Sequence, residues 1–211
     1  MRLYLASSNP RKLREFRQAA RAHGLRVEPI PNLERLPEVV EDGSTFAENA
    51  RKKAAQYSRY VEGLVFADDS GLCVEALGGA PGVRSARFAG ERASDDANNR
   101  KLLKELRRVE TSTKSPRNRR ARYVAVIVLA RRGKILPEVE GSASGEIIDE
   151  PRGSGGFGYD PYFYYPPLGK TFAELTPEEK FQVSHRGEAF RKLFAELKRL
   201  VANEKNPSLS F

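Results

Sequence analysis

Runs of apolar residues, and their alternation with polar ones, divide the chain into predicted strands. The segment 122–130 (RYVAVIVLA) has the strongest strand pattern. Shorter runs predict further strands at 3–5, 25–30, 64–67, 135–141, 145–148 and 162–165. Because the strands from 122 onward follow one another as a meander, we expect a mixed sheet and not a purely parallel one.

Apolar residues at helical spacing, each set preceded by capping residues, predict the helices. We expect helices to begin after Asn9, Thr45, Ser94 and Thr176, and a last amphipathic helix to follow a break at 184–187. The first should end at Gly24, with Leu13, Phe16, Arg17 and Ala20 on its inner side. Thr45 and Glu48 form a capping box for the second, whose apolar positions are Phe46, Ala50, Ala54, Tyr57 and Val61.

Length and composition describe a single globular unit. The chain has 211 residues, of which 39% are hydrophobic and 31% charged. We expect one two-lobed domain over 1–203 and a flexible tail at 204–211. No apolar run approaches the roughly 18 residues needed to span a bilayer, so we expect a cytoplasmic protein with no membrane contact. One cysteine, Cys73, cannot form an internal disulfide and reads as packing.

The formal net charge of +9 favours polyanionic partners, either nucleotides or nucleic acid. The densest basic run, 114–122, has no interleaved aromatic residues. We therefore interpret it as a solvated loop and do not expect nucleic-acid binding.

Two adjacent carboxylates, Asp68 and Asp69, follow the predicted strand 64–67. Ligands of open α/β sheets gather beyond the carboxyl ends of strands. Neighbouring carboxylates repel each other, which favours a cation between or beside them, and hard oxygen ligands suggest Mg²⁺. The alternative is a tight turn, since Asp-Ser-Gly suits one.

The loop between the first strand and first helix, Ser7 to Lys12, offers small hydroxyl groups, a lysine and a helix N-terminus. Such an arrangement predicts a phosphate seat with free backbone N–H groups. It lacks the glycine spacing of a Walker A loop, and a well-capped first helix explains it equally well.

Lys53 falls within the apolar sector of the second predicted helix, and Asn49 lies one turn earlier on its margin. An inward lysine needs an anion, so we expect a site lysine near Glu41. The alternative is a lysine whose stem packs while its ammonium group reaches solvent.

A glycine-rich stretch at 151–161 includes Phe157 and Tyr159, whose rings could stack on a planar base. A flexible linker is the alternative, although an aromatic strand follows directly.

His185 lies beside Arg186 at a predicted helix break. This position favours contact with a substrate over the alternative, a buried structural histidine.

Six separated motifs resemble the inosine/xanthosine triphosphate pyrophosphatase family, from about Leu3 to Leu200. They are SSNPRK (7–12), GSTFAENARKKA (43–54), ADDSGL (67–72), LGGAPGVRSAR (77–87), GGFGYDP (155–161) and LTPEEKFQVSHRG (175–187). The first motif departs from the Thr-Gly-Asn of many relatives, which should leave its phosphate role intact.

This resemblance implies an α/β fold with an elongated mixed sheet flanked by helices and two lobes around a central substrate cleft, usually as a homodimer. It implies Mg²⁺-dependent hydrolysis of a purine nucleoside triphosphate to the monophosphate and pyrophosphate. Asp69 is then the proton acceptor and a metal ligand, and Glu41 is the second metal ligand. The residues matching the family's substrate contacts are Ser7, Ser8, Asn9, Pro10, Arg11, Lys12, Lys53, Ser70, Phe157, Gly158, Tyr159, Asp160, Lys180, His185 and Arg186.

Base choice should depend on the 6-position of the purine. Donors such as Arg186 and His185 suit the O6 acceptor of hypoxanthine or xanthine and would face the amino group of adenine. Two other functions stay open: a hydrolase for pyrimidine or canonical nucleotides, and a non-catalytic nucleic-acid-binding module. The second gives Asp68 and Asp69 no role.

Overall fold

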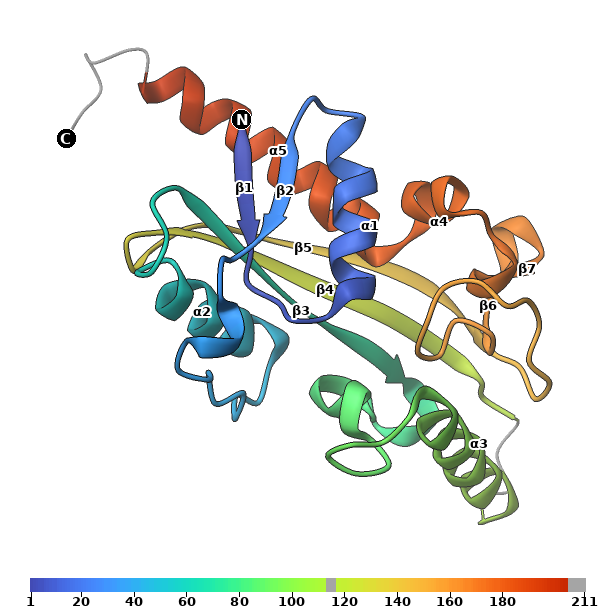
Figure 1. The fold of residues 1–211 in the computed structure, drawn as a ribbon. Coiled ribbons are helices and arrows are strands. Elements are labelled where there is room, and N and C mark those ends of the chain that lie inside the picture. Colours follow the sequence, from blue (N-terminus) through green and yellow to red (C-terminus); the bar gives the residue numbers. More distant parts are fainter. Residues whose placement is uncertain (113–116, 205–211) are drawn as a thin grey trace.

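The computed structural model describes residues 1–112 and 117–204, which form a seven-stranded sheet flanked by helices (Figure 1). The strand order is β2-β1-β3-β4-β5-β6-β7. β1 pairs in parallel with β2 and β3, and every later pair is antiparallel. The predicted mixed sheet is confirmed. The strands are β1 (Arg2–Leu5), β2 (Arg26–Pro29), β3 (Leu64–Val74), β4 (Arg120–Arg131), β5 (Lys134–Ile147), β6 (Phe163–Tyr165) and β7 (Lys170–Thr171).

Helices begin where the capping residues predict. Asn9 caps α1, Thr45 and Glu48 form the capping box of α2, and Gly24, with φ +65°, follows the end of α1. The α-helices are α1 (Pro10–Arg21), α2 (Phe46–Tyr57), α3 (Asp95–Ser112), α4 (Pro177–Val183) and α5 (His185–Glu204). Short 3₁₀ turns are η1 (Leu33–Arg35), η2 (Glu75–Leu77), η3 (Gly82–Arg87), η4 (Pro166–Leu168) and η5 (Phe172–Glu174).

β3 is much longer than the predicted strand at 64–67, and this corrects the placement of the carboxylates. Asp68 and Asp69 lie inside the strand, paired with Ile127 and Val126 of β4. The polar residues do not end the strand because β4, almost wholly apolar, supplies a hydrogen-bonding partner along its whole length. The turn interpretation of the Asp-Ser-Gly segment is therefore wrong.

β5 is a single strand where two were predicted. Its glycines mark close approach to a neighbour and do not break the strand. A Cβ on Gly141 would lie 2.3 Å from the backbone oxygen of His185 and from the backbone nitrogen of Ala189. The glycine thus lets α5 cross the sheet closely.

Three smaller predictions are also corrected. Arg17 is exposed, with its Nε donating to the carbonyl of Val27, and Ala19 takes its place on the inner side of α1. Val61 lies beyond the end of α2. The break before the last helix is short, because α5 begins at His185.

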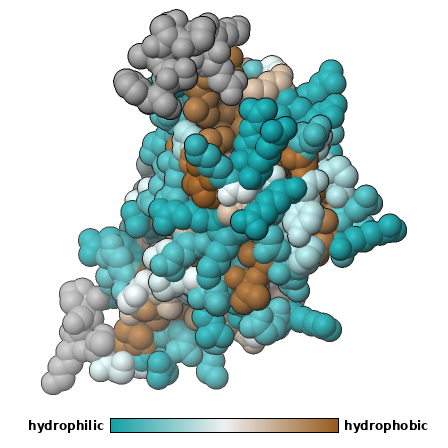
Figure 2. Space-filling view, turned by 90° about the vertical axis from the view of Figure 1, so that its left-hand side faces the viewer, coloured by the Kyte–Doolittle hydropathy of each residue, from teal (hydrophilic) through white to brown (hydrophobic). Residues whose placement is uncertain are grey.

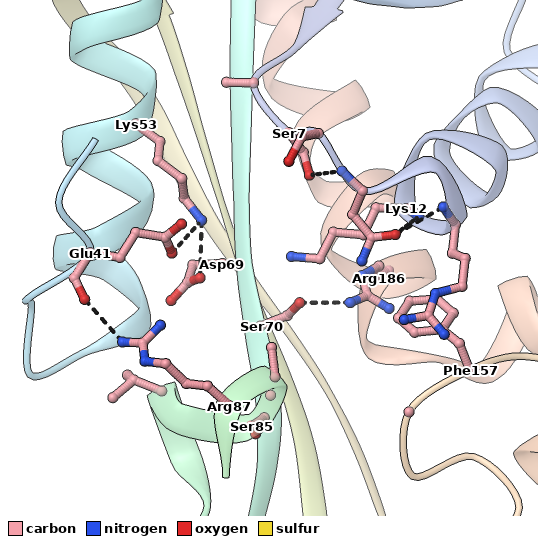
Figure 3. Close-up of a pocket in the computed structure, with 18 of the residues that line it drawn as sticks. Ser7, Lys12, Glu41, Lys53, Asp69, Ser70, Ser85, Arg87, Phe157 and Arg186 are labelled. Carbon is pink, nitrogen blue, oxygen red and sulfur yellow. Dashed lines mark hydrogen bonds and ion pairs between the residues drawn. The ribbon is translucent and has the colours of Figure 1, made fainter. Parts of the chain in front are cut away.

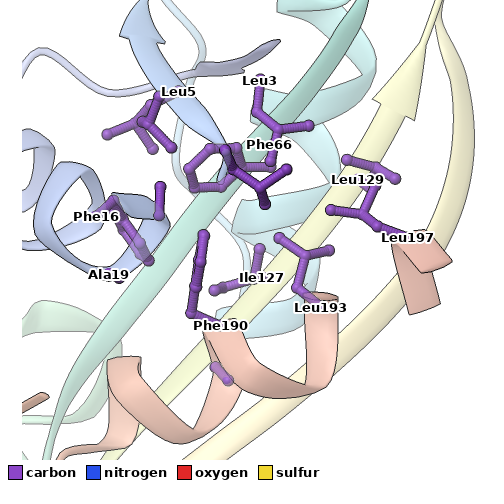
Figure 4. Packing of buried hydrophobic residues seen from close by; sticks show 14 of the residues in the cluster. Leu3, Leu5, Phe16, Ala19, Phe66, Ile127, Leu129, Phe190, Leu193 and Leu197 are labelled. Atoms are coloured by element: carbon purple, nitrogen blue, oxygen red, sulfur yellow. The ribbon is translucent and has the colours of Figure 1, made fainter. Parts of the chain in front are cut away.

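Buried side chains form three clusters around the long strands. On one face of the sheet, Leu3, Phe66 and Ile127 pack against Phe16 of α1 and Phe190 of α5 (Figure 4). On the opposite face, apolar residues of β3 and β4 pack under α2. A third cluster, at the far end of the same strands, joins α3 to β6 and η5. The first two clusters lie at one end of the long strands and the third lies at the other. We refer to these two ends of the sheet, with the helices packed on them, as the two lobes.

The face of the molecule shown in Figure 2 is mostly hydrophilic. On the face shown in Figure 2, hydrophobic residues appear as small, separate patches. Within residues 1–112 and 117–204, none of the helices has the length and apolar character needed to cross a membrane. The predicted tail at 204–211 lies outside the described residues after its first position, and 114–116 of the predicted basic loop lie outside them as well.

Candidate active site

A cleft of about 590 Å³ opens where β1 ends while its neighbour β3 continues. The pairing of these strands stops at Leu5 and Phe66, and the N–H of Ala6 makes the last bond of the ladder, 2.8 Å from the carbonyl oxygen of Phe66. Beyond it, the carbonyl oxygen of Asp68 accepts from Lys12 Nζ at 3.3 Å and from Lys53 Nζ at 3.1 Å. Two lysines from different helices thus occupy the edge of β3 that β1 leaves uncovered.

Asp68 and Asp69 point to opposite faces of the sheet, as neighbours in a strand must. Figure 3 shows Asp69 together with Lys53 and Glu41 on one side of β3. Asp68 faces α1 and α5, whereas Asp69 faces α2. The prediction that one cation sits between or beside both carboxylates is therefore wrong. Each carboxylate has its own partners.

Asp68 is fully buried and ion-paired. Its Oδ2 lies 2.7 Å from Lys12 Nζ and 3.4 Å from Arg186 Nε, and it accepts from Ser70 Oγ at 3.0 Å. Burial alone would raise the pKa of this carboxyl, but the charges of Lys12 and Arg186 outweigh burial and hold the pKa well below its usual range. Asp68 stays ionised and anchors the two cations.

Asp69 lies in a different environment, with Glu41 and Lys53. Lys53 Nζ lies 3.0 Å from Asp69 Oδ1 and 3.0 Å from Glu41 Oε2, and Asn49 Nδ2 donates to Asp69 Oδ2 at 3.4 Å. Burial raises the pKa of Asp69, against the charge of Lys53 and with the help of Glu41. Lys53 is 8% exposed, so the inward orientation predicted for it is confirmed and the solvent-reaching alternative is excluded.

The segment 7–12 lines the cleft, apart from Pro10. The N–H groups at the start of α1 are used by the helix cap, because Asn9 Oδ1 accepts from the N–H of Arg11 at 2.9 Å and of Lys12 at 3.4 Å. Pro10 has no N–H, and the N–H of Leu13 bonds to the carbonyl of Asn9. The N–H groups of Arg11 and Lys12 are therefore already used by the helix cap, and the phosphate role of the segment stays a prediction that rests on its side chains and on Ser7 and Ser8.

Phe157 lies at the junction of both lobes, surrounded by cations. Arg11, Lys180 and Arg186 lie 4.7, 5.1 and 5.0 Å from its ring centroid. Phe157 N donates to Asp160 Oδ2 at 2.7 Å, and the same oxygen accepts from Lys180 Nζ at 2.7 Å. The glycine-rich stretch is a tightly bonded loop here, which excludes the linker interpretation.

His185 and Arg186 begin α5 at the floor of the cleft. His185 stacks on Tyr123 with ring centroids 4.6 Å apart, and burial, with the charge of Arg186, lowers its pKa well below the usual value. His185 is buried, as the structural interpretation expects, and it also lines the cleft, so its contact with substrate stays a prediction. Arg186 Nη2 donates to Ser70 Oγ at 2.8 Å.

A second cavity of about 200 Å³ adjoins the first behind Phe157. Lys180 lines this smaller cavity and not the main cleft. Glu15, which the sequence reasoning missed, accepts from Lys180 at 2.6 Å and from Arg186 at 3.1 Å. Its signal was present, since Glu15 lies three residues after Lys12 on the same helix face.

Arg87, the last residue of the motif at 77–87, is a site residue that the sequence analysis did not predict. It lines the cleft, and its Nη2 donates to the carbonyl of Glu41 at 3.1 Å. No group of three or more His, Cys, Asp or Glu side chains within 1–112 and 117–204 is arranged to hold a metal ion. Glu41 and Asp69 are, however, two hard oxygen donors that converge on one ammonium group.

Comparison with known proteins gives consistent matches. Residues 3–196 match the model of the Ham1 family. A dITP/XTP pyrophosphatase of Acidobacterium capsulatum is 49% identical over 92% of this chain and 97% of its own, and one of Geobacillus kaustophilus is 46% identical over 96% and 97%. Among solved structures, the Ham1 protein of Staphylococcus aureus has a TM-score of 0.79 at 41% identity, covering 94% of this chain and 98% of that one. The HAM1 protein of Coxiella burnetii has a TM-score of 0.81 at 39% identity, covering 94% and 99%.

Proposed function

The chain belongs to the Ham1 family, and we propose that it hydrolyses non-canonical purine nucleoside triphosphates (ITP, dITP and XTP) to the monophosphate and pyrophosphate. The observation that carries the proposal is the convergence of Asp69, Glu41, Lys53 and Lys12 at the uncovered edge of β3. The names of its relatives supply the substrate class. Removing such nucleotides keeps their bases out of DNA and RNA.

Asp69 is the proposed proton acceptor. Its raised pKa contrasts with the depressed pKa of Asp68, and carboxylates whose environments separate their pKa values commonly divide into an acid–base group and a fixed charge. Asp69 orients a water molecule and takes its proton as the oxygen attacks the α-phosphorus. The bond from that phosphorus to the bridging oxygen breaks, and pyrophosphate leaves with the bridging oxygen.

Asp69 and Glu41 are the proposed ligands of Mg²⁺. Magnesium sites in nucleotide enzymes use one or two carboxylates and complete the shell with substrate phosphates and water, so this donor pair fits the ion. When bound, Mg²⁺ supplies positive charge to the leaving pyrophosphate and acidifies water. Lys53 pairs with both carboxylates and lines the cleft. With Mg²⁺ bound to those carboxylates, its ammonium group could pair with a substrate phosphate.

Side chains of α1, of α2 and of the loop before α1 would bind the phosphates. Lys12 and Lys53 act as point charges, and the hydroxyl groups of Ser7 and Ser8 line the same cleft. Because charge builds on the leaving group, fixed cations at this position lower the barrier without rearranging.

The smaller cavity behind Phe157 is the proposed base subsite. The ring of Phe157 offers a stacking surface, and Lys180 and Arg186 present donors that suit the O6 acceptor of hypoxanthine or xanthine. Adenine would direct an amino group at those donors and leave them unpaired, which would lower the affinity for an adenine nucleotide.

Product analysis on ITP tests the reaction. We expect equimolar IMP and pyrophosphate, and steady-state rates on ITP, XTP and dITP that exceed those on ATP and GTP by about a hundredfold or more. Release of orthophosphate would mean a different bond is cleaved. A rate on ATP equal to the rates on ITP, XTP and dITP would overturn the base-reading argument, whereas rejection of GTP, which also has an O6 acceptor, needs a separate obstacle at its 2-amino group.

Three further points belong to this proposal. We expect turnover to require a divalent ion and to be highest with Mg²⁺, tested by chelation and re-addition. We expect a homodimer, tested by light scattering, and a cytoplasmic location, tested by cell fractionation. We also propose that the remaining residues of the family's motifs bind the substrate: Asn9, Pro10, Arg11, Ser70, Gly158, Tyr159, Asp160 and His185.

A further inference from the structure

The backbone of Gly158 is held at both its N–H and its carbonyl group by the first turns of α3. Asp95 Oδ2 accepts from the N–H of Gly158 at 2.8 Å, and Asn99 Nδ2 donates to its carbonyl oxygen at 2.9 Å. Asp95 and Asn99 are four residues apart and so share one helix face. Gly158 has a φ of +66°, a conformation that glycine adopts without strain, and it sits directly after Phe157.

Asp95 also reaches across the cleft to α1. Its Oδ2 accepts from Arg11 Nη1, and its Oδ1 accepts from Arg11 Nη2 at 3.3 Å. The guanidinium of Arg11 lies over the ring of Phe157. One carboxylate therefore fixes both the backbone after Phe157 and the cation on its ring.

Asn99 has little other reason to be buried. It is 5% exposed, and within the part of the chain that the structure describes its Oδ1 has no hydrogen-bond partner. Burying an amide is costly unless it is hydrogen-bonded. The hydrogen bond from Asn99 Nδ2 to the carbonyl oxygen of Gly158 offsets part of the cost of burying this amide.

We propose that Asp95 and Asn99 are positioning residues that set the orientation of Phe157 and thereby the affinity for the purine base. The inference rests on the proposed function, because it assigns Phe157 to the base. It separates the two ends of the substrate: α3 controls the base end, whereas the lysines at the edge of β3 control the phosphate end.

The test compares Asp95→Ala, Asp95→Asn and Asn99→Asp with the matched control Asp96→Ala. Asp96 lies in the same helical turn, carries the same charge, is 72% exposed at its side chain and pairs along the helix with Arg100. Three quantities are measured for each protein: KM and kcat for ITP, and the inhibition constant of inorganic triphosphate, which has no base. Unfolding midpoints identify any variant that fails to fold.

We expect Asp95→Ala and Asn99→Asp to raise KM for ITP about tenfold, with kcat and the inhibition constant of triphosphate within about threefold of wild type. Asp95→Asn keeps an acceptor for the N–H of Gly158 and should recover part of the loss. A KM equal to that of Asp96→Ala, or a parallel rise in KM and in the inhibition constant, would overturn the inference. A wild-type protein that releases no pyrophosphate from ITP would instead refute the proposed function on which it rests.

Discussion

Adjacent positions in β3 give two aspartates different tasks. Asp68 faces α1 and α5 and is locked between Lys12 and Arg186, while Asp69 faces α2 and shares Lys53 with Glu41. The sequence reveals that both are present but not that they are separated by the sheet. Their different surroundings lead to opposite expectations for the same substitution.

Asp69→Asn should fold normally and lose catalysis. The variant keeps the side-chain shape but cannot accept a proton, so kcat for ITP should fall by about a hundredfold or more. Pyrophosphate release and the unfolding midpoint are the measurements. The exposed ion-paired carboxylate of Asp42 provides the control, because Asp42→Asn should leave both unchanged.

Asp68→Asn should instead destabilise the fold. It leaves Lys12 without its buried counter-charge and Arg186 with Glu15 alone, and breaking a buried pair from one side typically costs about 3 kcal/mol or more. Denaturant unfolding measures this loss. A free energy of unfolding equal to that of Asp69→Asn would contradict the anchoring role.

Glu15 should make stability dependent on acid. Burial raises its pKa, but the charges of Arg186 and Lys180 outweigh burial and place it below the ordinary value of 4.5. The stabilisation is therefore complete above that value and is lost as pH falls through the lower, folded pKa. We expect the free energy of unfolding to decline less steeply in acid for Glu15→Gln than for wild type, and parallel declines would refute this.

Most single side chains of the site could be identified from the sequence. Lys53 and Asn49 follow from the helical wheel of α2, and the family motifs supply Asp69, Phe157 and Arg186. Glu15 shares a face of α1 with Lys12 and could have been found there, whereas Asn99 could not, because its role arises from a contact with Gly158, more than fifty positions away. Such contacts leave no local pattern.

At the scale of elements, capping residues predict helix starts well, whereas strand ends are predicted poorly. Asn9, Thr45 and Thr176 cap their helices as expected, since a cap is a local interaction. The length of β3 and the continuity of β5 depend on the strands beside them. A polar pair or a glycine therefore looks like a strand end in sequence when the partner strand in fact carries the ladder onward.

Gly141 tests the close crossing of β5 and α5. A methyl group at this position would press on the backbone of His185 and Ala189, so Gly141→Ala should cost about 1–3 kcal/mol and also reduce turnover by shifting the start of α5. Denaturant unfolding and pyrophosphate release measure the two effects. Ser144→Ala, at an exposed position of the same strand, should change neither.

At the scale of the whole molecule, the long strands run through both lobes. β3, β4 and β5 contribute side chains or backbone to the clusters at each end of the sheet, so neither lobe has a sheet of its own. This arrangement supports a single two-lobed domain with the cleft between its ends.

We therefore expect one cooperative unfolding transition for the entire chain. Fluorescence of the tyrosines and far-UV circular dichroism should give coincident curves in denaturant. Adding a non-hydrolysable ITP analogue with Mg²⁺ should shift the whole curve to higher denaturant, because the ligand binds only the folded state. Two separate transitions would mean that the lobes are independent domains.

The early end of β1 has one more consequence. The ammonium groups of Lys12 and Lys53 satisfy a peptide oxygen that a longer strand would have covered. Lys53 already donates to Asp68, Asp69 and Glu41, so an incoming phosphate must compete with one of these oxygens for its protons, and binding to Lys53 is an exchange of partners. The affinity measured for any nucleotide then depends on how much more strongly the lysines bind a phosphate than the protein oxygen it replaces. A β1 long enough to cover the carbonyl oxygen of Asp68 would complete the ladder and weaken substrate binding.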